Sequence, residues 1–273
     1  MQVGLIKNFV NNIDQKYLAG FIGRVVRGKP VVKIELTSEE KKIIHEEVIR
    51  QTRLPVPSEQ DTKQVEIIVL KYKDPEIEVR CAQKIIENTE WPYKLTFYDN
   101  RFGTKNLAKI WNKLIRESTC DYVLLLNTDA FVPKLNPCWL TRMMQTFDVP
   151  GCAVVLPRVT RTSCRQQRSE VAEDKEPEKM TTIFAYQCVL FKKDIFEKVG
   201  YLDEEFLLHG QDSEWAFRFL QSQYSAYLRP DVLVEHLGHY SIKKAERNKE
   251  LYGIIESQYS LDLFNKKTKH LTK

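Results

Sequence analysis

The stretch Asp121-Tyr-Val-Leu-Leu-Leu-Asn-Thr-Asp-Ala130 decides how this chain folds. Its apolar run, Tyr122 to Leu126, is too short to span a membrane and has no charged residue to face solvent, so it predicts a strand buried on both faces. Such strands occur in parallel α/β sheets, whose ligands bind just beyond the carboxyl ends of the strands. Asn127 and Asp129 stand at that place, where amide and carboxylate oxygens suit a divalent metal and a phosphate.

Strand and helix patterns alternate on both sides of this stretch. The alternation predicts an α/β fold, with a mostly parallel central sheet flanked by helices and joined by right-handed crossovers. Strands are expected at 65–70, 93–98, 151–156, 183–191 and before His236, and helices at 75–88, 104–117, 137–147, 194–199 and 213–222.

The chain divides into a core, 61–241, and two flanking sections. Residues 1–60 carry no chemical motif and end in a proline-rich linker, so we expect an accessory segment for oligomerisation or acceptor binding. Residues 242–273 predict a basic amphipathic helix and tail that packs across the sheet. Within the core, 158–180 holds four arginines and then an acidic run. Its polarity predicts a mobile surface loop, either a solvated insertion or a lid over a ligand.

Composition sets broad limits on the class of protein. The 273 residues are 42% hydrophobic and 29% charged, as in an ordinary globular protein, and give room for one large domain with an appendage or for two modest domains. The net charge of +5 suits an anionic ligand but does not by itself indicate nucleic acid. Six scattered cysteines without a C-x-x-C pair indicate core residues in a reducing compartment. No apolar run is long enough to cross a membrane, so we expect a cytoplasmic protein, with peripheral membrane contact left open.

Polar motifs follow the predicted strands in order. Each motif alone also fits a structural turn or a packed side chain, and their shared order favours a functional interpretation. They are Val69-Leu-Lys-Tyr-Lys-Asp-Pro75, Phe97-Tyr-Asp-Asn100, Asn127-Thr-Asp129, Gly200-Tyr-Leu-Asp-Glu-Glu-Phe206 with His209-Gly-Gln-Asp-Ser-Glu-Trp-Ala-Phe-Arg218, and Val234-Glu-His-Leu-Gly-His-Tyr-Ser241.

Together these motifs resemble the inverting nucleotide-sugar glycosyltransferases of family two, such as rhamnosyltransferases, over about Val65 to Ser241. The resemblance implies the GT-A fold and transfer of a hexosyl or deoxyhexosyl group with inversion. The donor would be a nucleoside diphosphate sugar, and the acceptor a hydroxyl of a glycan, a lipid-linked molecule or another compound. It also implies Mn²⁺ or Mg²⁺, which offsets the charge that grows on the leaving diphosphate.

The resemblance also assigns roles to residues. Asp212 would be the general base that takes the proton of the acceptor hydroxyl, and Asp129 and His236 would bind the metal. Glu214 and His239 are candidate acceptor contacts. An acid at position 99 suits a base N–H group, because a carboxylate accepts hydrogen bonds. The donor-binding residues implied are Leu70, Tyr72, Asp99, Arg101, Asn127 and Asp129.

Two alternatives remain open from the sequence. Gln211 and Asn127 each replace an acid of the family pattern, which would fit a module that binds nucleotide sugars or glycans with weak catalysis. The arginines of 158–168 and the basic tail would fit a glycosyltransferase acting on modified nucleic acid. The nearby acidic run weakens that second alternative, and no basic stripe interleaved with aromatic residues supports it. The oligomeric state is open as well.

Overall fold

The computed structural model describes residues 64–71, 74–100, 106–168, 176–207, 209–238 and 252–268. The expected accessory segment, 1–60, lies outside the described residues. No described helix has the length and apolar character needed to cross a membrane.

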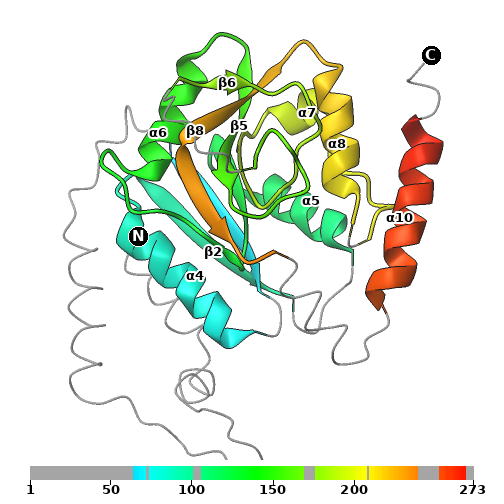
Figure 1. Cartoon of the computed structure of the whole chain (residues 1–273), viewed down its shortest axis with the longest axis horizontal. Coiled ribbons are helices and arrows are strands. Elements are labelled where there is room, and N and C mark those ends of the chain that lie inside the picture. The colour runs from blue at the N-terminus through cyan, green and yellow to red at the C-terminus, as the bar shows by residue number, and fades with distance from the viewer. Residues whose placement is uncertain are drawn as a thin grey trace, which may run out of the picture. The chain divides into compact units, whose positions relative to one another are not determined.

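The core is a sheet with the strand order β2-β1-β3-β7-β5-β8-β4, in which β6 pairs with β8 (Figure 1). Strand β1 is parallel to β2 and β3, and β5 is parallel to β8, whereas β7 is antiparallel to both β3 and β5. The strands are β1 (Val65–Lys71), β2 (Tyr93–Asp99), β3 (Tyr122–Asn127), β4 (Ala130–Phe131), β5 (Cys152–Val159), β6 (Glu178–Lys179), β7 (Cys188–Lys192) and β8 (Ser225–His236).

The predicted α/β architecture is therefore confirmed, with three reversed strands that the sequence pattern did not reveal: β7 and the two-residue strands β4 and β6. Strands β1, β2, β3, β5 and β8 point the same way, so their carboxyl ends meet at one edge of the sheet. The reversal of β7 has a simple cause. The described residues between β5 and β7 form no helix, and a parallel connection needs a crossover, usually a helix.

Helices cover both faces of the sheet (Figure 1). Side chains of α4 and α6 pack into one apolar cluster, and those of α5, α7 and α8 into a second cluster on the opposite face. Strand β3 contributes to both clusters because its side chains alternate, and Tyr122 to Leu126 are all buried, as predicted. The helices are α4 (Pro75–Asn88), α5 (Leu107–Glu117), α6 (Trp139–Gln145, followed by a 3₁₀ turn, Thr146–Asp148), α7 (Ile195–Val199), α8 (Gln211–Leu220) and α10 (Tyr252–Thr268).

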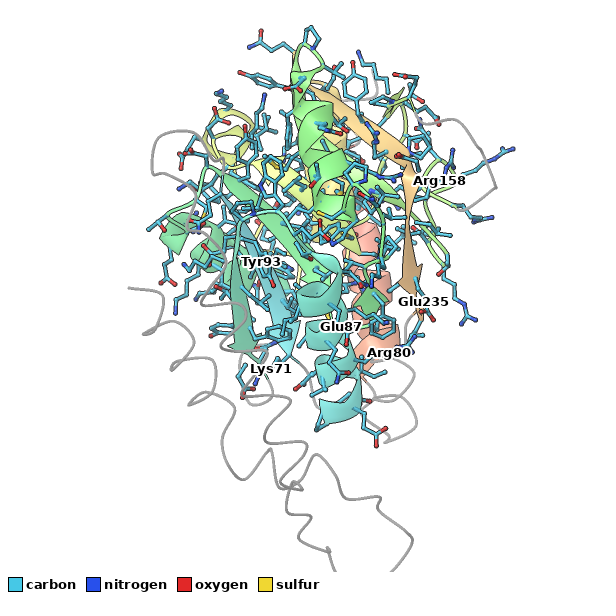
Figure 2. All side chains as sticks on the ribbon, turned by 90° about the vertical axis from the view of Figure 1, so that its left-hand side faces the viewer. Lys71, Arg80, Glu87, Tyr93, Arg158 and Glu235 are labelled. Atoms are coloured by element: carbon cyan, nitrogen blue, oxygen red, sulfur yellow. The ribbon has the colours of Figure 1, made fainter. Side chains whose placement is uncertain are left out.

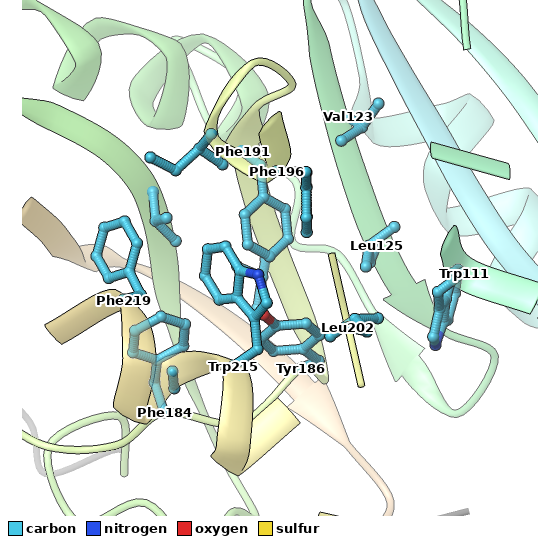
Figure 3. Close-up of a cluster of buried hydrophobic side chains, with 14 of the residues drawn as sticks. Trp111, Val123, Leu125, Phe184, Tyr186, Phe191, Phe196, Leu202, Trp215 and Phe219 are labelled. Atoms are coloured by element: carbon cyan, nitrogen blue, oxygen red, sulfur yellow. The ribbon is translucent and has the colours of Figure 1, made fainter. Parts of the chain in front are cut away.

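An aromatic cluster holds α8 against the sheet (Figure 3). Trp215 of α8 is completely buried, and its ring lies 5.5 Å from that of Phe191 in β7 and 5.2 Å from that of Phe196 in α7, measured between centroids. Its Nε1–H donates to the carbonyl of Gly200 at 2.7 Å. Buried aromatic residues of this size dominate core energetics, so this cluster fixes where the start of α8 lies.

The segment 158–180 differs from the surface loop expected. Its described parts include β6 and the fully buried Gln167. The neighbouring amide of Gln166 bonds the backbone of Lys179 and Thr181 at 2.8 and 3.0 Å. These partners are distant in sequence, so composition alone made the segment look like a solvated loop. Residues 169–175 lie outside the described part.

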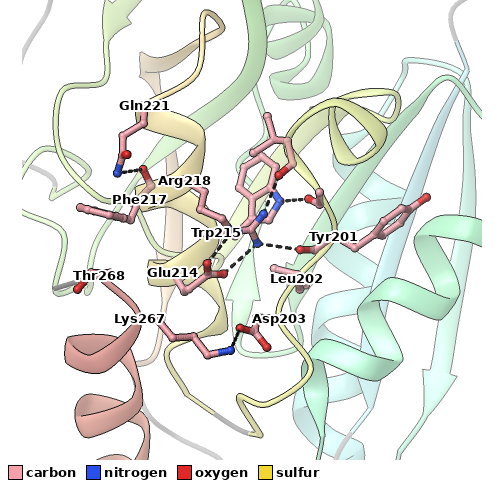
Figure 4. Close-up of polar contacts among 12 residues, drawn as sticks. Tyr201, Leu202, Asp203, Glu214, Trp215, Phe217, Arg218, Gln221, Lys267 and Thr268 are labelled. Atoms are coloured by element: carbon pink, nitrogen blue, oxygen red, sulfur yellow. Dashed lines mark hydrogen bonds and ion pairs between the residues drawn. The ribbon is translucent and has the colours of Figure 1, made fainter. Parts of the chain in front are cut away.

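The prediction that the C-terminal helix packs across the sheet is wrong. Helix α10 packs against α8 and the segment that precedes it. The rings of Phe264 and Phe217 lie 6.1 Å apart, and Lys267 pairs with Glu205 at 3.2 Å. Lys267 also pairs with Asp203 (Figure 4). Helix α8 thus lies between the aromatic cluster on one side and α10 on the other.

Asn112 of α5 joins this helix to the segment that leads into α8. Its amide donates to the carbonyl of Leu202 at 2.8 Å and accepts the N–H of Leu202 at 3.0 Å. It also donates to Glu204 at 2.9 Å. Asn112 is only 1% exposed, so water does not replace these bonds.

We expect Asn112→Leu to lower the free energy of unfolding by about 2 to 4 kcal/mol, because two buried backbone groups of Leu202 lose their partners. Urea denaturation monitored by circular dichroism measures the change. The neighbouring exposed residue gives the control: Lys113→Leu should change the free energy of unfolding by less than about 0.5 kcal/mol. Equal effects of the two substitutions would contradict the role of Asn112.

Candidate functional site

The shared edge of the parallel strands collects most of the predicted site residues. The register pairs Leu70 of β1 with Asn127, the last residue of β3, and pairs Lys71 with Asp99, the last residue of β2. His236 is the last residue of β8. Because these strands point the same way, polar groups at their ends face one region, as ligand sites in open α/β sheets require.

Asp129 and His236 lie in contact. A turn follows β3, and the short strand β4 then pairs Ala130 with His236. The N–H of Leu237 donates to the carbonyl of Asp129 at 3.0 Å, which closes the arrangement. Asp129 Oδ1 and His236 Nε2 are 3.3 Å apart, and both residues are 7% exposed. The backbone of two strands therefore sets this pair, rather than two flexible side chains.

The hydrogen-bond partner of the other ring nitrogen of His236 shows which nitrogen carries a proton. Nδ1 lies 2.6 Å from the carbonyl oxygen of Arg161, and a carbonyl only accepts hydrogen bonds, so Nδ1 carries a proton. In a neutral ring the lone pair of Nε2 then points at the carboxylate of Asp129. These two electron-rich atoms attract each other only if a proton or a metal cation lies between them.

The pKa of His236 agrees with this geometry. Burial lowers the pKa of the imidazole, but the hydrogen bond and charge of Asp129 raise it more, and the carbonyl of Arg161 raises it further. The net result is a pKa above the usual value of 6.5. A proton therefore occupies the position between Asp129 and His236 up to a higher pH than in a free imidazole when no metal competes for it.

The pair fits a divalent metal of the Mg²⁺ or Mn²⁺ kind. Adjacent ligands of an octahedral ion at about 2.1 Å are about 3.0 Å apart, close to the separation of Asp129 Oδ1 and His236 Nε2. The carbonyl of Arg161 orients the imidazole, as outer partners of metal-bound histidines usually do. Among the described residues no group of three His, Cys, Asp or Glu side chains could hold a metal. Two protein ligands suffice for ions completed by substrate phosphates and water.

Asp212 lies in the first turn of α8. Its Oδ1 accepts the N–H of Ser213 at 2.8 Å, and its Oδ2 accepts the N–H of Tyr186 at 3.4 Å. Burial raises the pKa of the carboxyl group, and the N–H groups of Ser213 and Tyr186 and the charge of His209 offset only part of that rise. A carboxylate whose pKa is raised is a stronger base, and in its ionised form it is suited to accept a proton.

The residue before α8 must be a glycine. Gly210 has φ +86°, and a Cβ atom there would lie 2.8 Å from the ring of Phe206 and 3.4 Å from the side chain of Ser260 in α10. The close approach of these three segments sets the direction in which α8 begins, and hence the position of Asp212.

A two-residue turn connects Asp212 to the metal side of the site. Tyr186 donates its N–H to Asp212, and the carbonyl of the next residue, Gln187, accepts the N–H of Asn127 at 2.9 Å. Asn127 ends β3, two residues before Asp129. The structure thus brings the ends of β3 and β8 and the start of α8 together, through backbone groups that the sequence motifs do not reveal.

The predicted donor side contains two polar residues that sequence reasoning missed. Glu78 of α4 and Asn100 after β2 are 6% and 7% exposed, and Glu78 Oε1 and Asn100 Oδ1 have no hydrogen-bond partner. Burial raises the pKa of Glu78, which nearby Lys71 partly opposes. Asp99, a predicted donor-binding residue, has its Oδ2 atom 3.9 Å from Nζ of Lys71, and 38% of the Asp99 side chain is exposed. Glu78 lies in the first turn of α4, the helix that follows β1, and an acid at that place was the available signal.

Glu214 has a different role from the predicted acceptor contact. Both of its carboxylate oxygens bond Arg218, at 2.5 and 2.9 Å, and the residue is 6% exposed (Figure 4). Arg218 also donates to the carbonyls of Val199 and Tyr201 at 2.7 and 2.8 Å. Glu214 therefore holds α8 to the preceding segment. The remaining predicted residues, Tyr72, Arg101 and His239, lie outside the described part of the chain.

Arg80 of α4 closes the outer side of the β4–β8 pair. It bonds Glu235 at 2.8 Å and covers the ring of Phe131 with a cation–centroid distance of 4.0 Å (Figure 2). Glu235 directly precedes His236, so this contact ties α4 to the strand end that carries the histidine.

Comparison with solved structures identifies the fold. The chain is similar to GalNAc-T7, solved with UDP, GalNAc and Mn²⁺, with a TM-score of 0.51 and 10% identity over 79% of this chain and 55% of that chain. It is also similar to the mannosyltransferase PcManGT from Pyrobaculum calidifontis, solved with GDP-Man and Mn²⁺, with a TM-score of 0.51 and 19% identity over 71% and 64%. The fold is GT-A.

These similarities cover less than two thirds of either glycosyltransferase chain. No protein-family model matches this chain, and a comparison with curated proteins finds no match. At such low identity the comparisons establish the GT-A fold and leave the activity to the chemistry of the site.

We expect the imidazole of His236 to titrate above pH 6.5 in metal-free protein, and Asp129→Asn to lower that pKa, because the amide removes the negative charge beside Nε2. The chemical shift of the His236 Cε1 proton, followed by NMR against pH, measures both values. Asp194→Asn changes an exposed carboxylate at the start of α7 and should leave the titration unchanged. A His236 pKa that is insensitive to Asp129→Asn would contradict the contact.

Proposed function

We propose that this chain is a metal-dependent glycosyltransferase that moves a sugar from a nucleoside diphosphate sugar to an acceptor hydroxyl. The observation that carries the proposal is the Asp129–His236 pair, whose geometry calls for a cation, at the same sheet edge as Asp212. The bound Mn²⁺ or Mg²⁺ would stabilise the negative charge of the departing diphosphate. The GT-A fold supports the proposal, since the two structures compared above hold a nucleotide or nucleotide sugar together with Mn²⁺.

The proposed reaction is a single displacement with inversion. Asp212 accepts the proton of the acceptor hydroxyl while that oxygen forms a bond to the anomeric carbon. The bond between the anomeric carbon and the diphosphate oxygen breaks, and its electron pair leaves with the diphosphate. Because the base serves an incoming hydroxyl and no side chain forms a covalent intermediate, the configuration at the anomeric carbon is inverted.

The donor side of the site is proposed at the ends of β1 and β2. Asp99 and Glu78 offer oxygens to the N–H groups of a nucleobase, and Leu70 offers an apolar contact beside them. Tyr72, Arg101 and Asn127 complete the donor-binding set in this proposal. On the motifs quoted above, we assign the chain to the family-two glycosyltransferases, with a hexose or deoxyhexose as the transferred sugar and a glycan or lipid-linked hydroxyl as the acceptor.

We expect Asp212→Asn to lower turnover by about 10² to 10⁴ without weakening donor binding, because the amide cannot accept the proton but keeps the shape of the carboxylate. UDP-, GDP-, dTDP- and CDP-sugars with Mn²⁺ are the donors to test. Release of nucleoside diphosphate measures turnover, and ligand-induced thermal stabilisation measures donor binding.

Two further results decide whether this proposal stands. Asp194→Asn, outside the site, should keep full turnover. Asp212→Asn should also unfold at a higher temperature than the natural chain at pH 7, since the pKa of Asp212 is raised in the folded state and its ionisation therefore costs stability. Full turnover by folded Asp212→Asn would refute the assignment of the base.

We expect kcat/KM to fall at acidic pH with a midpoint above 3.8, the usual pKa of an aspartic acid, because burial raises the pKa of Asp212. The base acts only when ionised, so activity is present above this pKa and is lost as the pH falls through it. The pH profile should be measured at saturating Mn²⁺, which separates protonation of Asp212 from loss of metal. An acid limb with its midpoint at or below 3.8 would contradict the raised pKa.

A further inference from the structure

The loop Thr160–Arg168 leaves β5 in an unusual way. Strands β5 and β8 are parallel and their register ends with Val159 opposite Val234, after which the N–H of Thr160 donates to the carbonyl of Val234 at 3.1 Å. In a regular parallel ladder the carbonyl of Thr160 would accept the N–H of His236. Here the Thr160 hydroxyl accepts it instead, at 2.9 Å, and donates to the His236 carbonyl at 3.2 Å.

Because the Thr160 hydroxyl takes the place of the Thr160 carbonyl in the ladder, the chain changes direction here. The backbone after Thr160 is released from the ladder and turns, which brings the carbonyl of Arg161 to Nδ1 of His236 at 2.6 Å. The hydroxyl of Thr160 thus holds the backbone of His236, while the next residue along the chain orients its ring.

The other end of the same loop reaches the other half of the site. Gln167 is fully buried, and its side-chain amide accepts the N–H of Ala185 at 2.9 Å and donates to the Ala185 carbonyl at 3.3 Å. Its own carbonyl accepts the N–H of Val159 at 2.8 Å, so the loop closes onto the end of β5. Tyr186, the residue after Ala185, donates its N–H to Asp212.

We propose that the loop Thr160–Arg168 is a brace that positions both halves of the site, His236 through Thr160 and Asp212 through Gln167. The proposal rests on the function proposed above and adds two positioning residues to it. Because one closed loop carries both contacts, a change at either end alters both the affinity for the metal and the contact of the Tyr186 N–H with Asp212.

The decisive variant is Thr160→Val, which keeps the size and branching of the side chain and removes only the hydroxyl. We expect it to weaken Mn²⁺ binding about tenfold, the lower end of the effect of removing an outer partner of a metal ligand. Electron paramagnetic resonance of free Mn²⁺, without donor or acceptor, measures this affinity. The same variant should also move the acid limb of the kcat/KM profile to higher pH, because the N–H of Tyr186 is no longer held firmly against Asp212.

The reciprocal variant is Gln167→Leu, which should move the acid limb to higher pH and also weaken Mn²⁺ binding. Gln223→Leu and Thr141→Val are the controls. They make the same chemical changes outside the loop Thr160–Arg168, at residues whose side chains bond Tyr224 at 3.3 Å and Cys138 at 3.1 Å, respectively. Both controls should keep the Mn²⁺ affinity and the pH profile of the natural chain.

The outcomes separate the brace from the proposed function. Mn²⁺ binding by the natural chain that His236→Ala leaves intact would refute the proposed function. If binding needs His236 but Thr160→Val changes only the Mn²⁺ affinity, or changes nothing, the brace is refuted and the function stands. Thr160→Val decides the question alone if Gln167→Leu fails to fold.

Discussion

The hydrogen bond from the ring of His236 to the carbonyl of Arg161 is the constraint on which the site depends. It places the proton on Nδ1, so Nε2 presents its lone pair to the carboxylate of Asp129. The contact is attractive only with a cation between the two groups. The parallel pairing of β5 and β8 and the side-chain bond of Thr160 both act to bring that carbonyl to the ring. Strand pairing thus brings Nε2 of His236 and the carboxylate of Asp129 together at the sheet edge.

The position and charge of Asp212, the proposed base, depend on a different balance of interactions. The aromatic cluster around Trp215 fixes α8, and burial near this cluster disfavours the charge on Asp212. The N–H groups of Ser213 and Tyr186 favour the charge and recover part of that cost. If burial acted alone, the pKa of the carboxyl group would rise further, whereas a fully solvated carboxylate would be a weaker base. The position of Tyr186 therefore matters as much as that of Asp212 itself.

Much of this arrangement could be predicted from the sequence, because the signals are local. The apolar run before Asn127 identified the buried central strand. The order of the motifs predicted that Asp129, Asp212 and His236 lie at one sheet edge, and Asp129 and His236 are in contact there. The direction of β7 could not be predicted, because periodicity reports which faces of a strand are buried and not which way it runs. The role of Gln167 could not be predicted either, because its hydrogen-bond partner Ala185 comes close to it only after folding.

The pairing of Glu214 with Arg218 could have been predicted from the sequence, although comparison with the family motif suggested an acceptor contact instead. Residues two apart on an α-helix point about 200° away from each other, so an acid at position 214 faces away from an acid at position 212. Residues four apart lie on the same side, which pairs Glu214 with Arg218. Helical geometry alone thus separates the carboxylate that faces Tyr186 from the one that holds α8 to the chain before it. Two acids in one motif here have two functions, and the helix repeat distinguishes them.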